Sequence, residues 1–336
     1  MKLFFQKRWL VVFCLFAQLI FPVLCGAQGD YPGKPERPLI LESFRSLIIS
    51  ADKAGLPSLL ESLTGFTHLI NLLHTAGKPE TMIIPASGRA APQTKPGRLR
   101  ILTANTLLFP WPFYSDQAER ISAFAKLARS VSPDIIFLQE VWDNNSLRLL
   151  LAKFPDYHAV IAPNPLFNLG GLMIFSRIAP VRATAESFPL TLNHNPEELI
   201  ARKGILWAEI SCSGRQIWLA TTHLYSSAAK ARFRPNTWQF RHLLQRMQAA
   251  PDLVIVGGDM NLEPAELESY LPERVMRDDC NLPTAGRKIQ KKLDYVLAAD
   301  QQDPSAIRIP GSRVEWEKRF SDHHAVLAEV IFSPRP

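Results

Sequence analysis

The stretch "DLVIVGGDMNLEP", residues 252–264, joins an apolar run to two polar side chains. The apolar residues 253–256 predict a strand in the core, and the glycine pair that follows lets the backbone leave the sheet. Asp259 and Asn261 are two positions apart, so in an extended chain their side chains point to the same side. This arrangement is typical either of a turn that closes a strand or of a functional site at the end of a strand.

The composition of the whole chain is that of a folded protein. It has 336 residues, 47% of them hydrophobic, enough for one large core or two modest ones. The formal net charge is +7. A mildly basic balance favours an anionic partner, either nucleic acid or lipid head groups, without choosing between them.

Residues 1–27 have the pattern of a signal peptide. Lys2, Lys7 and Arg8 precede an uncharged apolar run that ends in the small residues of "CGA". Removing this segment takes away three positive charges and no negative one, so the net charge falls from +7 to +4. We expect a secreted or periplasmic protein. The alternative is that the apolar run stays as an N-terminal membrane anchor.

The rest of the chain divides into three parts. Residues 28–77 have apolar residues at helical spacing and predict a helical extension, and residues 78–97 are rich in Pro and Gly and predict a linker. From residue 98 to 334, short apolar runs alternate with helical stretches, which indicates a layered α/β fold. A hairpin is expected to turn near Ser213 and Gly214. Cys212 and Cys280 are the cysteines outside the signal peptide, and whether they pair stays open.

Polar residues stand at the ends of several predicted strands. Each one alone is ordinary for a turn or a solvated position, but together they are the acids, amides and histidines that a metal-assisted phosphoester hydrolase needs. Carboxylates hold a hard divalent ion, an amide donates to phosphate without adding charge, and imidazole accepts a proton from water when a carboxylate fixes its tautomer. The residues are Asn105, Glu140, His223, Asp259, Asn261, Asp294, Asp322 and His323.

Six motifs that contain these residues occur in the order of a known superfamily. They are "ILTANT", "FLQEVW", "LATTHL", "VGGDMN", "KKLDYV" and "FSDHHAV". In this respect the chain resembles the endonuclease/exonuclease/phosphatase superfamily from about residue 98 to 330. The resemblance implies a four-layered α/β sandwich, in which two mixed β-sheets pack face to face and helices flank them. It does not account for the N-terminal helical extension.

The resemblance also implies a role for each of these residues. Glu140 matches the principal magnesium ligand, with Asn105 and Asp322 beside it, and Mn²⁺ or another divalent ion is the alternative to Mg²⁺. His323 matches the general base, and Asp294 the carboxylate that orients it.

The remaining site residues match positions that handle the substrate. Asp259 and Asn261 resemble the pair that positions the nucleophile and binds the phosphoryl group. His223 resembles a second histidine that contacts phosphate or assists the leaving group. The opening stretch is therefore predicted to be catalytic.

Within the superfamily, the chain resembles the neutral sphingomyelinases, both the secreted bacterial and the animal type. The segments that carry this resemblance are "SDQAERISAFAKLARSVSPDIIFLQEVWDN" and "GGLMIFSRIAP". It implies hydrolysis of a phospholipid head-group phosphodiester, sphingomyelin to ceramide and phosphocholine, by water that His323 activates at a membrane surface. The alternatives are a secreted endonuclease that acts on nucleic acid with the same residues, and a catalytically silent binding module. No obligate protein partner is expected.

Two loops are candidates for contact with a membrane. Trp111 and Phe113, in "LLFPWPFYS", could insert at an interface, where aromatic rings are favoured. Arg232, in "SSAAKARFRPNTW", could meet lipid phosphates. The alternatives are that the aromatic rings pack over the sheet edge and that the basic loop is only solvated.

Overall fold

The structure is a computed structural model that describes residues 80–88, 95–108, 116–163, 168–188, 201–226, 235–285, 290–315 and 320–335. The predicted signal peptide (1–27) and helical extension (28–77) lie outside these residues. The predicted linker (78–97) is described at 80–88 and 95–97, where it contains a short strand, β1 (Met82–Ile84). None of the helices in the described part of the chain is long and apolar enough to cross a membrane.

The described strands form two sheets. The order in the first sheet is β1, β4 (His158–Pro163), β5 (Asn168–Ser176), β3 (Ile135–Val141), β2 (Arg98–Leu108), β14 (Ala325–Phe332) and β12 (Ile307–Arg308), and β13 (Arg313–Glu315) also pairs with β14. The order in the second sheet is β10 (Val275–Arg277), β11 (Asp294–Asp300), β9 (Leu253–Asp259), β8 (Arg215–His223), β7 (Gly204–Cys212) and β6 (Pro180–Ser187). Each sheet mixes parallel and antiparallel pairs.

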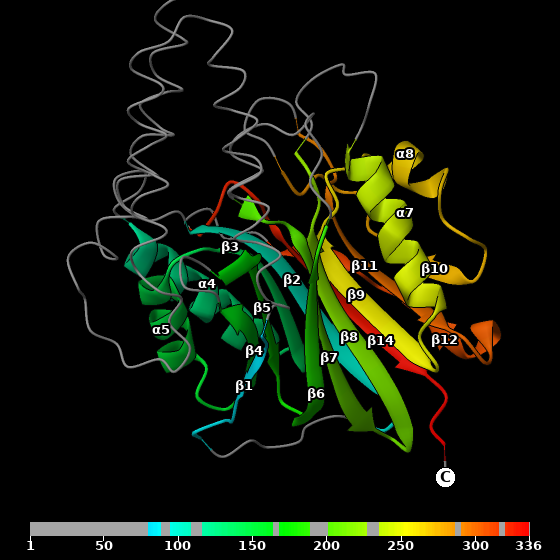
Figure 1. Cartoon of the computed structure of the whole chain (residues 1–336), viewed down its shortest axis with the longest axis horizontal. Coiled ribbons are helices and arrows are strands. Elements are labelled where there is room, and N and C mark those ends of the chain that lie inside the picture. The colour runs from blue at the N-terminus through cyan, green and yellow to red at the C-terminus, as the bar shows by residue number, and fades with distance from the viewer. Residues whose placement is uncertain are drawn as a thin grey trace, which may run out of the picture. The chain divides into compact units, whose positions relative to one another are not determined.

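The two sheets pack face to face, and helices cover their outer faces. Side chains such as Phe137, Leu219 and Ile255 fill the space between the sheets. Helices α4 (Gln117–Val131) and α5 (Asn144–Lys153) lie on the outer side of the first sheet, and α7 (Pro235–Gln248) and α8 (Pro264–Glu268) on that of the second (Figure 1). Because β3 and β9 are buried on both faces, each begins with a run of four apolar residues, 135–138 and 253–256. The predicted four-layered sandwich is confirmed.

Strand pairing brings the predicted site residues to one end of the sandwich. In the second sheet, Asp259 is opposite His223 on one side and opposite Asp294 on the other. In the first sheet, β2 and β3 run parallel, with Asn105 opposite Gln139, so that Asn105 and Glu140 reach the same edge. His323 precedes β14, which runs from this end down to the C-terminus (Figure 1).

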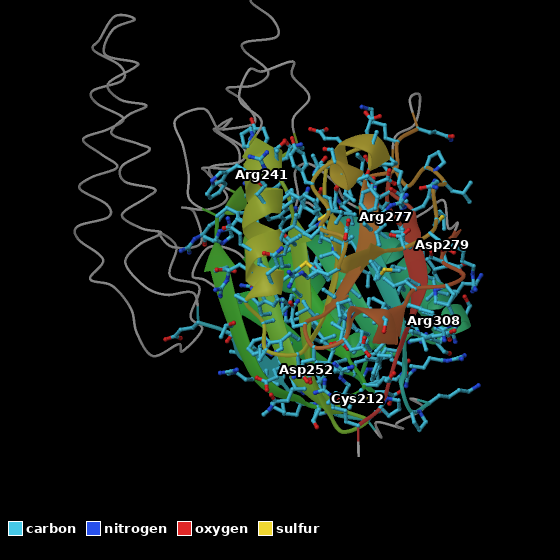
Figure 2. All side chains as sticks on the ribbon, turned by 90° about the vertical axis from the view of Figure 1, so that its right-hand side faces the viewer. Cys212, Arg241, Asp252, Arg277, Asp279 and Arg308 are labelled. Atoms are coloured by element: carbon cyan, nitrogen blue, oxygen red, sulfur yellow. The ribbon has the colours of Figure 1, made fainter. Side chains whose placement is uncertain are left out.

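The opposite end is closed by a hairpin and an ionic network. The turn between β7 and β8 falls at Ser213 and Gly214, as predicted, and both residues have positive φ. Arg215, at the start of β8, is buried and pairs with Asp252 and Asp300. Figure 2 shows Asp252 and Cys212 toward the lower end of the molecule, whereas Arg241 of α7 lies toward the upper end. Cys212 and Cys280 are both buried and free.

Candidate active site

A single amide joins two carboxylates that come from different sheets. Asn105 Nδ2 donates to Glu140 Oε1 at 2.8 Å and to Asp259 Oδ2 at 3.1 Å. Its Oδ1 accepts from the backbone N–H of Leu107 at 3.1 Å. An exchange of the amide oxygen and nitrogen would place an oxygen against two carboxylates, so these contacts determine the orientation of the side chain. Asn105 thereby ties the first sheet to the second at the site.

Glu140 is a strained and incompletely satisfied carboxylate. It has a φ of 62°, which is unusual for a residue other than glycine, and only 8% of it is exposed. Burial raises the pKa of its carboxyl group, and the hydrogen bond from Asn105 opposes this shift. Its Oε2 is buried and has no hydrogen-bond partner among the described residues. A buried carboxylate oxygen without a donor is costly unless a cation meets it, so Glu140 fits a hard divalent ion.

His323 and Asp294 form a hydrogen-bonded pair beside Asp259. Nδ1 of His323 lies 2.8 Å from Asp294 Oδ2, and Nε2 faces Asp259 Oδ2 at 3.8 Å. Burial disfavours the charged imidazole, but the carboxylates of Asp294 and Asp259 outweigh it and raise the pKa of His323 to about 10. Burial and the Asp294 carboxylate together raise the pKa of Asp259 to about 7. Asp294 fixes Nδ1, so the Nε2 edge is the one that faces the site.

Two groups of side chains could hold a cation. Ligand atoms of Asp259, Asp294 and His323 all lie within 4.8 Å of one another. In this trio, however, the imidazole Nδ1 and one Asp294 oxygen already bond to each other. Two buried carboxylate oxygens, Glu140 Oε2 and Asp294 Oδ1, have no hydrogen-bond partner among the described residues, and of these two carboxylates only that of Asp294 is bonded to the imidazole. We therefore assign the better cation position to Glu140.

A buried lysine that the sequence analysis missed lies beside His223. Lys203 is only 5% exposed, and its ammonium lies 3.1 Å from His223 Nε2 and donates to the Leu224 carbonyl at 2.8 Å. Burial, together with the charges of Lys203 and His323, lowers the pKa of His223 well below 6.5. Because an ammonium only donates, Nε2 of His223 is the acceptor and its hydrogen is on Nδ1. The position of Lys203 directly before the buried strand β7 was the available signal.

Asp259 and Asn261 form both a turn and part of the site. The Asn261 N–H donates to Asp259 Oδ1 at 3.0 Å, and Asn261 has a φ of 47°. Its Nδ2 donates to the Leu224 carbonyl at 2.9 Å, and Asn236, at the start of α7, donates to the Asn261 carbonyl at 2.9 Å. The two readings of the opening stretch therefore describe one arrangement, since the Asx turn orients the carboxylate.

Comparison with protein families identifies the fold. Residues 102–323 match the model of the Endonuclease/Exonuclease/phosphatase family. This match spans more than half of the chain. The chain belongs to this family. The predicted family is confirmed, and so is the predicted similarity of the chain to neutral sphingomyelinases.

The relatives of the chain within the family carry different names. Tyrosyl-DNA phosphodiesterase 2 of Danio rerio is 27% identical over 191 residues, which cover 54% of this chain and 46% of that protein. A putative neutral sphingomyelinase of Drosophila melanogaster is 25% identical over 285 residues, which cover 71% and 62%. The matches to the tyrosyl-DNA phosphodiesterases span about half the length of those proteins.

Solved structures of the family share the fold. The crystal structure of a humanized D. rerio TDP2 matches with a TM-score of 0.59 at 20% identity, over 70% of this chain and 99% of that one. The crystal structure of SmcL matches with a TM-score of 0.55 at 16% identity, over 70% and 100%. At such identities the likeness concerns the fold alone.

The remaining predicted residues differ in where they lie. Asp322 is exposed, its Oδ1 accepts a hydrogen bond from Ser321 Oγ at 3.4 Å, and its charge acts on Glu140 to raise the pKa of that carboxyl. Trp111, Phe113 and Arg232 lie outside the described residues. The other seven residues come together at one end of the family's sandwich. Their roles in catalysis stay predictions.

Proposed function

We propose that this chain is a divalent-metal-dependent phosphodiesterase that hydrolyses sphingomyelin to ceramide and phosphocholine. The observation that carries the proposal is the unpartnered, buried oxygen of Glu140 beside the hydrogen-bonded pair of His323 and Asp294. A cation position next to an oriented imidazole is what hydrolysis of an anionic phosphodiester requires.

Glu140 would hold the ion through Oε2, Asn105 would orient that carboxylate through its Nδ2 group, and Asp322 would lie near the ion. A carboxylate oxygen, with waters and substrate oxygens completing the coordination, suits Mg²⁺, with Mn²⁺ as the alternative. When bound, the ion would offset the negative charge of the phosphoryl oxygens and of the surrounding carboxylates. The fit rests on the free Oε2 of Glu140.

His323 would act as the general base through Nε2. With a pKa of about 10 the imidazole is protonated at neutral pH, and an imidazolium cannot accept a proton. The reaction therefore needs part of the surrounding negative charge to be neutralised first. Asp294 holds the Nδ1 hydrogen, so the neutral ring directs its Nε2 lone pair toward Asp259 and the space where a water would be activated.

His223 and Asn261 would contact the phosphoryl group and the leaving oxygen. His223 is neutral, and its Nδ1–H has no hydrogen-bond partner in the described part of the chain. The Lys203 ammonium next to it adds a fixed positive charge in a buried setting, where electrostatic stabilisation is strong.

The names and the extent of the relatives support a sphingolipid substrate. The match to the putative neutral sphingomyelinase of D. melanogaster spans 71% of this chain, compared with 54% for tyrosyl-DNA phosphodiesterase 2 of D. rerio. Sphingomyelin phosphodiesterase 2 of Homo sapiens is 23% identical over 183 residues, 51% of this chain and 42% of that protein. We also propose that the enzyme works on a membrane surface after export, as residues 1–27 predict.

A phosphodiester in DNA is the second candidate substrate. The similarity to tyrosyl-DNA phosphodiesterase 2 in sequence favours it, and the same residues would perform the hydrolysis. A basic net charge, +7 for the whole chain and +4 without residues 1–27, suits either anionic substrate. The two candidates differ in the substrate and agree on the site.

Hydrolysis by the purified full-length chain tests the proposal. Sphingomyelin vesicles, phosphatidylcholine vesicles, plasmid DNA and an oligonucleotide with a phosphotyrosyl end are offered side by side, with Mg²⁺ and with a chelator. We expect Mg²⁺-dependent release of phosphocholine from sphingomyelin, and a loss of at least about 100-fold in His323→Ala. If DNA were cleaved and the lipids were not, the second candidate, a phosphodiester in DNA, would be the substrate. No divalent-dependent turnover on any substrate would favour the silent binding module.

A further inference from the structure

A buried threonine lies between the two chain segments that carry Asp294 and His323. Thr284 is fully buried and belongs to the segment that follows β10. Its Oγ1 accepts hydrogen bonds from the backbone N–H groups of Leu293 at 3.0 Å and Asp294 at 3.1 Å. Its carbonyl accepts from the backbone N–H of His324 at 2.7 Å. One residue is therefore bonded to Asp294 and to His324, the residue directly after His323.

The hydroxyl oxygen satisfies two consecutive amides at the point where β11 begins. Asp294 is the first residue of this strand, and its carboxylate is fully buried. Buried amides without an acceptor destabilise a protein, because they lose their hydrogen bonds to water without gaining another partner. An oxygen from another segment that accepts from both amides also fixes the backbone direction from which the Asp294 side chain leaves.

The main chain of the same segment holds the other half of the pair. Ala285 forms a β-bridge with His323 on one side and with Lys291 on the other. The Thr284 N–H donates to the Lys291 carbonyl at 2.9 Å. This segment thus lies between the residues that lead into β11 and the residues that lead into β14. The hydrogen bond of 2.8 Å between His323 Nδ1 and Asp294 Oδ2 joins these two segments.

We propose that Thr284 is a positioning residue: its hydroxyl holds the start of β11, its carbonyl holds the segment of His323, and together they set the geometry of the Asp294–His323 pair. The consequence for turnover rests on the phosphodiesterase function proposed above. A loss of the hydroxyl would reduce the rate of the chemical step, because a displacement of about 1 Å in a catalytic group can cost about 100-fold.

The test compares three variants of the full-length chain. Thr284→Val keeps the approximate shape and removes the oxygen, whereas Thr284→Ser keeps the oxygen. Ser176→Ala is the matched control, because Ser176 is a buried hydroxyl bonded to the backbone of Ile178 at the far end of β5. If Thr284→Val does not fold, Thr284→Cys replaces it, since a thiol is a weak acceptor.

Proton NMR reports the pair without any substrate. The hydrogen between His323 Nδ1 and Asp294 gives a downfield signal, which His323→Ala identifies by its loss. We expect this signal to move or vanish in Thr284→Val and to persist in Thr284→Ser and Ser176→Ala. An unchanged signal in a folded Thr284→Val protein would overturn the proposal, whether or not the chain has phosphodiesterase activity.

Turnover tests the consequence separately. With the substrate that the unsubstituted chain (the parent) hydrolyses, Thr284→Val should lower kcat about 100-fold with little change in KM. The reason is that the hydroxyl positions the base and does not touch the substrate. Thr284→Ser should restore most of the rate. A parent without turnover would refute the proposed function alone, and the NMR signal would still decide the role of Thr284. A parent-like kcat in Thr284→Val would overturn the positioning role.

Discussion

Gly171 lies directly against the backbone of Glu140. A Cβ on Gly171 would lie 2.9 Å from the Glu140 Cα and 3.0 Å from the Val141 nitrogen, and Gly171 itself has a φ of 66°. Glu140 has a positive φ as well. A residue in such a sparsely populated conformation persists only where its surroundings require it. The close approach of Gly171 from β5 is thus part of what holds the proposed cation ligand in place.

Replacing Gly171 with alanine should therefore weaken metal binding. The added methyl group would push the Glu140 backbone, and we expect a weaker affinity for Mg²⁺ together with a loss of about 1–3 kcal/mol in the free energy of unfolding. Titration of Mg²⁺ by calorimetry measures the first effect, and denaturant unfolding measures the second.

Gly311→Ala is the matched control for this change. Gly311 has a φ of 67°, but a Cβ there would meet nothing within 4 Å. The Gly311→Ala variant has the cost of a positive φ at alanine but no contact with Glu140, so its affinity for Mg²⁺ should equal that of the unsubstituted chain. Equal affinities in the two variants would contradict the supporting role of Gly171.

The lysine beside His223 offers a second prediction. In Lys203→Met, the removal of the positive charge should raise the pKa of His223, since that charge is one of the causes that lower it. The loss of a charged hydrogen bond in a buried site should reduce kcat by about 10- to 100-fold. NMR of the His223 ring nitrogens follows the pKa and the tautomer, and the substrate assay follows kcat. Lys126→Met, an exposed lysine on α4, should change neither. An unaltered His223 spectrum in Lys203→Met would contradict the assigned tautomer.

The strands that carry the site could be predicted from the sequence, whereas the contacts between those strands could not. Asp259, Glu140 and Asn105 each end or interrupt an apolar run, so their position at a strand end could be read from the residues alone. Nothing in the local sequence distinguishes Lys203 from a solvated residue before a strand. Its burial depends on the pairing of β7 with β8, which brings it to His223 and Leu224, 20 and 21 positions away.

The same limit explains two other features. Thr284 lies in a segment without regular secondary structure, and its importance comes from bonds to residues 293, 294 and 324 that no local pattern contains. Strand β1 lies in a Pro- and Gly-rich region, where composition favours a linker. It forms because Ile83 and Ile84 can pair with β4 at the edge of the first sheet and pack against the core.

The ionic network at the far end of the second sheet predicts an acid-sensitive stability. Burial of Asp300 raises its pKa, but hydrogen bonds, those from Arg215 first among them, lower it below the ordinary value overall. A carboxyl whose pKa is lower in the folded state stabilises the protein above the unfolded pKa of about 4 and loses that contribution as pH falls through the folded pKa. In Asp300→Asn, the free energy of unfolding at pH 7 should fall by about 1–3 kcal/mol.

The difference between Asp300→Asn and the parent should narrow below about pH 4, and urea unfolding from pH 7 to pH 3 measures it. Glu329→Gln serves as the control, because Glu329 forms a partly exposed pair with Arg98, and such pairs contribute little. A difference that stays constant over the whole range would show that ionisation of Asp300 is not its source.

Glu140→Gln should change stability in opposite directions with and without a divalent ion. Because burial raises the pKa of Glu140, its ionised form opposes folding at neutral pH, and that cost disappears as pH falls below the unfolded value. In a chelator at pH 7, the variant should therefore be at least as stable as the parent. With Mg²⁺ at about 100 times its Kd, the free energy of unfolding of the parent should rise by about 2.7 kcal/mol, and that of the variant should rise little.

Thermal unfolding in both buffers measures these changes, and Glu329→Gln is the control, which should be stabilised by Mg²⁺ as much as the parent. If Mg²⁺ stabilised Glu140→Gln as much as the parent, Glu140 would not be the ligand. The cation site would then be assigned to Asp259, Asp294 and His323, whose ligand atoms lie close together.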